Sequence, residues 1–211
     1  DSLVALGAIG ATVRSKFSKP VVGITGSCGK TSTKEMLRCL LGEDRTHATA
    51  GNWNNRIGVP MTLAGLDSNQ QDFAVIEAGI NQPDEMVQLG GMIQADLNVL
   101  TNIEAAHLEL LGSLENIASE KSLLAKLAKQ GSPIILHADA LRYNAYKKLA
   151  HRAIVLLPEG CAAPDLPIKH IVSYKVSEQI ENLGVNRALQ ASQQVTVNGQ
   201  NYLIASPSKG I

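Results

Sequence analysis

Residues 21–32 read Val21-Val22-Gly23-Ile24-Thr25-Gly26-Ser27-Cys28-Gly29-Lys30-Thr31-Ser32. The first five residues form a short apolar run, which predicts a buried β-strand, and the spacing of apolar residues over 30–41 predicts a helix. The glycines between these two elements allow backbone N–H groups to turn inward around an anion. A strand, a glycine-containing turn and a helix that opens on lysine and a hydroxyl residue are typical of a phosphate-binding loop.

We expect this loop to bind the phosphates of ATP. Lys30 is placed to neutralise the β- and γ-phosphates, and Thr31 to offer its hydroxyl to Mg²⁺. The spacing is tighter than G-x-x-x-x-G-K-[ST], because Ile24 stands where that pattern has its first glycine. A turn with an incidental lysine is the plainer alternative, but it leaves the coincidence of strand, glycines, lysine and hydroxyl without a cause. The candidate ATP-binding residues are Gly26, Ser27, Cys28, Gly29, Lys30, Thr31 and Ser32.

The rest of the chain repeats the alternation of strand and helix. Apolar runs predict further strands at 73–76, 95–101, 134–136 and 153–157, and helical spacing predicts helices at 3–16, 83–89, 114–129 and 140–149. This order predicts an α/β fold, with a mostly parallel P-loop-type sheet and helices on both faces. Alternation over 185–206 around Asn198-Gly199 adds a small antiparallel hairpin or flap near the C-terminus.

The amino-acid composition indicates which classes of binding partner the protein is expected to lack. Lys plus Arg and Asp plus Glu both number 19, and aromatic residues make up 3% of the chain, so we expect no nucleic-acid partner. There is no apolar run of about 18 residues, so we expect no membrane insertion. Three cysteines without C-x-x-C spacing are typical of free thiols in a reducing cytoplasm.

Two further polar residues follow predicted strands. Glu77 ends the run from 73, and His107 follows the run that ends at 101. The carboxyl ends of parallel strands meet at one edge of the sheet, so both residues are expected on the same edge as Lys30. A carboxylate there can hold Mg²⁺, whereas a histidine is an unusual ligand for that ion. Lys121 lies on a predicted helix among other charged residues, and its charge pattern alone predicts a solvated side chain.

Residues 49–60 contain three asparagine side chains between glycines. This composition predicts a loop that hydrogen-bonds a ligand, with Asn52, Asn54 and Asn55 as candidate substrate-binding residues. An ordinary loop rich in turns is the alternative reading of the same residues.

Together these motifs resemble the Mur ligase family. The resemblance rests on Gly26 to Thr31, the segment 51–60, Val75-Ile76-Glu77 and the stretch 102–107, and it covers residues 1–157 well. It implies a three-domain ATP-dependent peptide ligase of which 1–211 is the central ATP-binding domain, with an entry helix over 1–19 and a flap over 168–211. It also implies that a UDP-binding domain and a carboxyl-terminal domain belong to the same protein and lie outside this chain.

The resemblance assigns roles to residues and partners. Lys30 contacts phosphates, Thr31 and Glu77 serve a first Mg²⁺, His107 serves a second, and Lys121 carries a carbamate that adds oxygen ligands. Lys30, His107 and Lys121 are thus the implied catalytic residues. The implied cytoplasmic reaction joins D-alanyl-D-alanine to UDP-N-acetylmuramoyl-tripeptide through an acyl phosphate, in peptidoglycan precursor synthesis. One departure is Leu123, where the family often has glutamate.

Three alternatives stay open. Within the family, the chain could serve another Mur step or a ligase that adds glutamate to folate. A P-loop GTPase or kinase is disfavoured because no Asn-Lys-x-Asp motif occurs in the sequence. A P-loop module that binds nucleotide without catalysis is the third.

Overall fold

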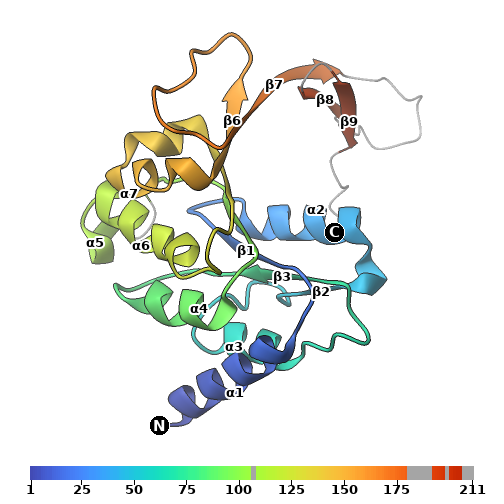
Figure 1. Ribbon diagram of the computed structural model, residues 1–211, viewed down its shortest axis with the longest axis vertical. Coiled ribbons are helices and arrows are strands. Elements are labelled where there is room, and N and C mark those ends of the chain that lie inside the picture. Colours follow the sequence, from blue (N-terminus) through green and yellow to red (C-terminus); the bar gives the residue numbers. More distant parts are fainter. Residues whose placement is uncertain (106–107, 180–191, 198–199, 206–211) are drawn as a thin grey trace.

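The computed structural model describes residues 1–105, 108–179, 192–197 and 200–205 (Figure 1). The described strands form one sheet in the order β2-β3-β1-β4-β5-β6-β7-β8-β9, and every pairing from β2 to β7 is parallel. The strands are β1 (Val21–Thr25), β2 (Thr46–Ala48), β3 (Phe73–Glu77), β4 (Leu97–Leu100), β5 (Ile134–His137), β6 (Ala153–Pro158), β7 (His170–Gln179), β8 (Ser192–Val197) and β9 (Gln200–Ala205). The predicted mostly parallel α/β sheet is confirmed.

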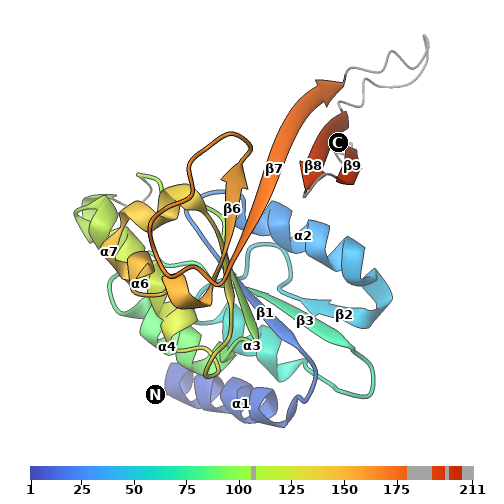
Figure 2. The same cartoon turned by 45° about the horizontal axis from the view of Figure 1, so that its top comes forward.

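Helices cover both faces of this sheet, as predicted (Figure 2). Helix α2 packs on β1, β2 and β3 from one side, whereas α6 packs on β1 from the other and contacts α4 and α7. Helix α1 lies outermost, against α3 and α4. The helices are α1 (Ser2–Lys16), α2 (Lys30–Leu41), α3 (Gly58–Ala64), α4 (Glu85–Ile93), α5 (Leu108–Leu111), α6 (Leu114–Lys126) and α7 (Asn144–Lys147).

The sheet separates two clusters of buried hydrophobic residues. A small cluster of Val22, Ile24 and Val75 packs against Leu37 and Leu41 of α2. The larger cluster lies on the opposite face and includes completely buried side chains from β3, α4, α6 and β5. Because β1 is buried along its whole length, its apolar run is the expected sequence of a central parallel strand.

The register of the sheet brings the functional segments to one edge. Ile24 of β1 lies beside Glu77 of β3, and Thr25 lies beside Leu100 of β4. The chain after β1 and β4 therefore leaves the sheet at the same edge at which β3 ends. The sheet grows outward from β1 in both directions, so this edge is the switch point where open α/β sheets bind ligands.

The end of the described chain is an antiparallel extension of the sheet. Strand β7 pairs in parallel with β6, and β8 and β9 then follow in antiparallel pairing, with Val197 opposite Gln200. The predicted hairpin is confirmed by this register, although its Asn198 and Gly199 lie outside the described residues. In Figure 2, β7 rises away from the helical layers and carries β8 and β9 with it. The hairpin is therefore joined to the main sheet by a long parallel strand.

Several predicted element boundaries were wrong. Residues 140–149 do not form one helix, because Tyr143 is extended and separates a 3₁₀ turn at Ala138–Arg142 from α7. Helix α4 begins at Glu85 after Asp84, which has a positive φ of 66°. The short strand β2, helix α3 and strand β7 were not predicted as such.

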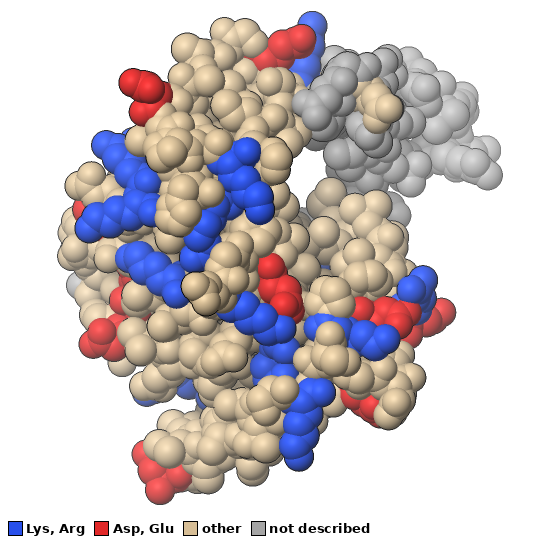
Figure 3. Space-filling view, in the orientation of Figure 1, with Lys and Arg blue, Asp and Glu red and all other residues tan. Residues whose placement is uncertain are grey.

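The surface agrees with the balanced composition. On the face shown in Figure 3, Lys and Arg side chains gather over the region of α6 and α7, and acidic side chains lie at several separate places. The three cysteines are free and exposed. Among the described residues, no helix combines the length and the apolar character needed to cross a bilayer.

Candidate active site

The loop between β1 and α2 has the conformation that its glycines permit. Gly29 has a φ of 78° and precedes the first residue of α2, and a Cβ built on it meets no atom within 4 Å. Gly26 has a φ of 153°, and a Cβ there would overlap the Thr101 hydroxyl. The N-terminus of the twelve-residue helix α2 is thus open and has no side-chain cap, which leaves its first N–H groups available to an anion.

The segment after β4 holds the phosphate loop in place. The Asn102 side-chain oxygen accepts hydrogen bonds from the backbone N–H groups of Ser27 (3.1 Å) and Cys28 (2.8 Å). The Thr101 hydroxyl donates to the Cys28 carbonyl at 2.6 Å. These bonds fix the loop without using Lys30 or Thr31. Neither Thr101 nor Asn102 was predicted to hold the loop, although a polar pair at the end of a predicted strand at this edge is the signal that indicates them.

Two lysine side chains converge on the loop. Lys30 Nζ donates to the carbonyls of Gly26 (3.0 Å) and Ser27 (3.2 Å), and Lys121 Nζ donates to the same Gly26 carbonyl at 3.0 Å. Lys121 is 3% exposed, so the solvated side chain predicted from its charge pattern is wrong. Burial, together with the neighbouring charge of Lys30, lowers the pKa of Lys121 to about 8.

Glu77 is the buried carboxylate of the site. It is 0% exposed and ends β3 beside the phosphate loop. Its two oxygens lie 3.2 and 3.0 Å from the Thr31 hydroxyl, and Asn54 Nδ2 donates to Oε1 at 2.7 Å. The Glu77 backbone N–H donates to the Thr49 hydroxyl at 2.9 Å. The structure thus brings the predicted metal residues Thr31 and Glu77 together, and adds Asn54 to them.

A small cavity of about 100 Å³ lies between the phosphate loop and the segments that carry Asn54 and Lys121. Lys30 and Lys121 line it together with Asn54, from three different segments of the chain. Asn81, which follows β3, lines it as well and was not predicted. The remaining lining residues are Gly26, Ser27, Gly79 and Ile80.

The other predicted loop residues differ in their surroundings. The Ser27 hydroxyl donates to the Glu104 carbonyl at 3.0 Å, and Cys28 Sγ lies 3.5 Å from Glu104 Oε2. Ser32 is exposed in the first turn of α2. His107 lies outside the described residues, so its predicted role stays a prediction. Among the residues that the structure does describe, His, Cys, Asp and Glu form no group of three suited to a metal.

The three asparagines of residues 49–60 differ in their contacts and exposure. Asn55 Oδ1 accepts from the N–H groups of Ile57 and Gly58, both at 3.0 Å, and thereby supports the start of α3. Asn54 faces Glu77, and Asn52 is exposed. All three asparagines line one cavity of about 520 Å³, which they share with Trp53, Ile57, Gly58 and Asn81.

A buried lysine connects this segment to α2. Lys34 is 0% exposed, and its Nζ donates to the carbonyls of Thr49 and Gly51, both at 2.7 Å, and lies 2.9 Å from Glu35 Oε1. No role for Lys34 was predicted from the sequence, because its position on an amphipathic helix is also typical of a solvated lysine. Its contacts fix the start of the segment that carries Asn54.

We expect Lys34→Met to lower the free energy of unfolding by about 1–3 kcal/mol, since two buried carbonyls lose their donor. Urea unfolding of this chain measures the change. Lys147→Met is the matched control, because Lys147 is exposed on α7. Equal stability of the two variants would show that water replaces the Lys34 ammonium at no cost.

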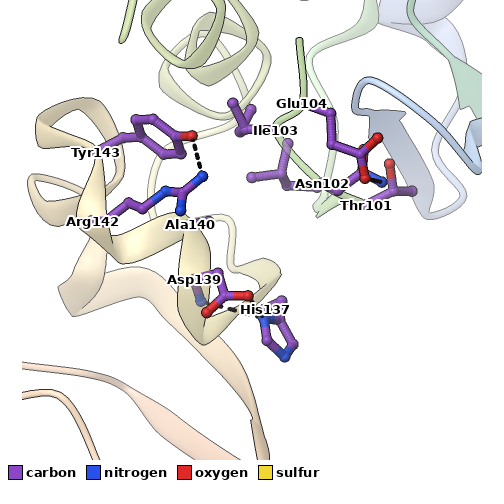
Figure 4. A pocket seen from close by; sticks show the side chains of 10 residues that line it. Thr101, Asn102, Ile103, Glu104, His137, Asp139, Ala140, Arg142 and Tyr143 are labelled. Atoms are coloured by element: carbon purple, nitrogen blue, oxygen red, sulfur yellow. Dashed lines mark hydrogen bonds and ion pairs between the residues drawn. The ribbon is translucent and has the colours of Figure 1, made fainter. Parts of the chain in front are cut away.

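A third cavity of about 270 Å³ borders the site on the side of β4 and β5 (Figure 4). One wall is the segment 100–104, and the other is formed by residues between His137 and Tyr143. In Figure 4, Arg142 and Tyr143 stand opposite Asn102 and Glu104 across the opening. This cavity therefore shares Thr101 and Asn102 with the segment that holds the phosphate loop.

A parallel sheet with a glycine-containing loop, a lysine and a buried carboxylate at its switch point defines the P-loop class of α/β domains. A family profile described as the Mur ligase middle domain matches residues 24–207. The chain therefore belongs to the Mur ligase middle-domain family.

Curated relatives give the comparison in sequence. UDP-N-acetylmuramoyl-tripeptide–D-alanyl-D-alanine ligase of Escherichia coli (strain K12) is 40% identical over 140 residues, which is 66% of this chain and 31% of that protein. The protein of the same name from Buchnera aphidicola subsp. Acyrthosiphon pisum (strain APS) is 38% identical over 149 residues, 70% of this chain and 32% of that one. The chain thus spans about a third of the length of these relatives.

Solved structures agree with the family. MurF from Acinetobacter baumannii superposes with a TM-score of 0.76 at 27% identity, covering 98% of this chain and 43% of that one. MurF ligase from Thermotoga maritima in complex with ADP gives a TM-score of 0.76 at 25% identity, covering 97% of this chain and 44% of that one. A folylpolyglutamate synthase from Mycobacterium tuberculosis in complex with ADP shares the fold, with a TM-score of 0.63 at 17% identity over 92% of this chain and 51% of that one.

Proposed function

We propose that this chain is the central ATP-binding domain of a cytoplasmic ligase that joins D-alanyl-D-alanine to UDP-N-acetylmuramoyl-tripeptide. The names of the relatives support this reaction, and so does their identity of 38% and 40% to the chain. In this proposal residues 1–211 work with a UDP-binding domain and a carboxyl-terminal domain of the same protein, and the flap over 168–211 belongs to the central domain.

The observation that carries the proposal is the convergence of Lys30 and Lys121 on the Gly26 carbonyl beside an open helix N-terminus. The ammonium of Lys30 and a helix end directed at one cavity favour an anion of high charge, such as the phosphates of ATP. A turn with an incidental lysine does not account for the second, buried lysine, which comes from α6.

The donor set also fits Mg²⁺, which the family resemblance implies. Glu77 and Thr31 offer carboxylate and hydroxyl oxygens, and oxygen is the ligand atom that Mg²⁺ prefers. The Thr31 hydroxyl lies 3.2 and 3.0 Å from the two Glu77 carboxylate oxygens, so both residues offer oxygen atoms at the same place in the site. When bound, Mg²⁺ supplies charge neutralisation between phosphate oxygens.

The reaction that this site supports begins with phosphoryl transfer. The terminal carboxylate of the peptide attacks the γ-phosphorus of ATP, the bond to the bridging oxygen breaks, and ADP leaves. The amine of the second substrate, in its neutral form, then attacks the acyl phosphate carbonyl, and phosphate and one proton leave as the amide forms. Lys30 stabilises charge on the transferred group, while Asn102 holds the loop in register, because phosphoryl transfer depends mainly on positioning and charge.

The remaining roles in the proposal come from the resemblance. Asn52, Asn54 and Asn55 belong to the substrate-binding segment, with Asn54 oriented by Glu77. His107 and a carbamylated Lys121 serve a second Mg²⁺. The burial of Lys121 supports its part, because an amine of lowered pKa is neutral, and so reactive toward CO₂, at lower pH than an ordinary lysine.

The alternative functions differ from the proposed one in the amine used or in whether phosphate is released. Another Mur step or a folate-directed ligase keeps the site and changes the amine, and the synthase from Mycobacterium tuberculosis shares only the fold at 17% identity. A nucleotide-binding module without catalysis binds ATP and releases no phosphate.

Phosphate release by the full-length ligase is the test. We expect release with Mg²⁺ and ATP to need both UDP-N-acetylmuramoyl-tripeptide and D-alanyl-D-alanine. Release that ignores the dipeptide and responds to another amine contradicts the named step and keeps the family. No release with any amine contradicts catalysis.

A further inference from the structure

The cavity of about 270 Å³ beside the phosphate loop has walls of opposite charge. Arg142 contributes a guanidinium on the side of β5, and Glu104 contributes a carboxylate on the side of β4 (Figure 4). No ion pair joins these two side chains among the described residues. A small pocket with separated cationic and anionic walls favours a ligand that carries both charges.

The guanidinium is held in position by its neighbour. Arg142 Nη2 donates to the Tyr143 hydroxyl at 2.7 Å, and the guanidinium carbon lies 4.9 Å from the centre of the Tyr143 ring. Tyr143 is 6% exposed, so it is a fixed support. Arg142 itself is exposed and keeps further N–H groups for a carboxylate, which a guanidinium can bind through two parallel bonds.

The acidic wall is tied to the phosphate loop. The Glu104 backbone N–H donates to the Ser27 hydroxyl at 2.9 Å, and Asn102 Nδ2 donates to Glu104 Oε1 at 3.1 Å. A positive group at Glu104 therefore lies beside the loop, and a negative group at Arg142 lies farther from it.

The second acid of the pocket is already paired. Asp139 Oδ2 lies 3.1 Å from His137 Nδ1, and His137 Nε2 lies 3.0 Å from the Tyr174 hydroxyl. In Figure 4 the Asp139 carboxylate lies beside the His137 ring, apart from Tyr143 and Glu104, and its side chain is 82% exposed. Arg142 and Glu104 are the charged groups on the two opposite walls, and the Glu104 carboxylate also accepts from Asn102 Nδ2 at 3.1 Å and lies 3.5 Å from Cys28 Sγ.

We propose that this cavity binds the free dipeptide substrate as a zwitterion, with its carboxylate on Arg142 and its amino group toward Glu104. The inference rests on the proposed ligase function and adds the site of the amine substrate to it. A volume of about 270 Å³ lies below that of pockets for drug-sized ligands, as a dipeptide requires. In this orientation the amino group enters at the phosphate loop, where the acyl phosphate is made.

The test measures steady-state kinetics of the full-length ligase with two amine substrates, D-alanyl-D-alanine and its C-terminal amide. We expect the wild-type protein to prefer the free dipeptide in kcat/KM by about tenfold, the size of one charge-assisted contact. We expect Arg142→Gln to raise the KM for the dipeptide about tenfold with kcat within about threefold, and to lose its preference for the free carboxylate.

Lys147→Gln is the matched control, because it removes an exposed positive charge of nearby α7 that does not line the cavity. The control is expected to keep the wild-type preference. Glu104→Gln removes the opposite wall and is expected to raise the KM for both amines equally, because both keep the amino group.

An undiminished preference for the free carboxylate in Arg142→Gln overturns the inference and leaves the ligase function standing. A rise in the KM for ATP or for UDP-N-acetylmuramoyl-tripeptide, with that for the dipeptide unchanged, assigns the cavity to another substrate and also overturns it. Absence of phosphate release by the wild-type protein with every amine overturns both proposals.

Discussion

Replacing Lys30 with alanine is expected to lower ATP-dependent phosphate release by the full-length ligase at least 10²-fold, about the effect of removing one charge-stabilising group from a preorganised site. Lys30 is the first residue of α2, and its ammonium lies over the loop at 3.0 Å from the Gly26 carbonyl. The loop itself is held by Asn102, so the loss of the lysine removes charge and leaves the backbone in place. We therefore expect the effect mainly in kcat.

The control for this variant is Lys16→Ala, which removes an exposed lysine from the end of α1. It is expected to behave as wild type. Thermal unfolding of Lys30→Ala checks that the domain is intact, since the two bonds of the ammonium are to carbonyls of its own loop. Activity of Lys30→Ala within about threefold of wild type, measured by phosphate release, would remove the lysine from the mechanism.

The phosphate loop could be predicted because its signal is local. An apolar strand, two glycines at positions that need unusual backbone angles, and a lysine opening a helix lie within residues 21–32. Each of these features depends on neighbours in sequence. The same holds for the Ser113 cap of α6, whose hydroxyl accepts from the Asn116 N–H as an N-cap residue does.

What the sequence did not reveal depends on contacts between distant segments. Strand β2 has three residues and becomes a strand through its pairing with β3. Strand β7 follows a loop rich in proline and alanine, and its parallel pairing with β6 adds it to the sheet. Periodicity within a short window carries no information on either pairing.

Buried charged side chains are the second feature that could not be predicted from the sequence. Lys34 and Lys121 lie on helices with ordinary charge patterns, yet their side chains are 0% and 3% exposed. Their partners are backbone carbonyls 15 and 95 positions away, so only the folded chain brings them together. For Lys121 the family resemblance corrected the prediction from charge, and the structure gives the physical ground for it.

The burial of Lys121 lowers its pKa, which favours the carbamylation that we propose for it. CO₂ reacts with a neutral amine to give a carbamate, and one proton is released as the N–C bond forms. With a pKa of about 8 instead of 10.5, the neutral fraction of Lys121 near pH 7.5 is roughly 10²-fold larger than that of an exposed lysine. Burial disfavours the charged form of a base, so the neutral form of Lys121 appears at lower pH than that of an exposed lysine.

We expect incubation of the protein with ¹³C-labelled bicarbonate to give a carbamate signal in the ¹³C spectrum, and Lys121→Ala to lose both this signal and at least 10²-fold of the phosphate-release rate. At constant dissolved CO₂ the signal should grow as pH rises through about 8, because the neutral amine becomes the main species. Lys126→Ala, on the same helix and exposed, is the control and should keep signal and rate. Added bicarbonate should not rescue Lys121→Ala, since the nitrogen that carries the carbamate is gone. Full activity of Lys121→Ala contradicts the catalytic role, whereas a lost rate without any carbamate signal in the wild-type protein assigns the ammonium itself, bound to the Gly26 carbonyl, as the required group.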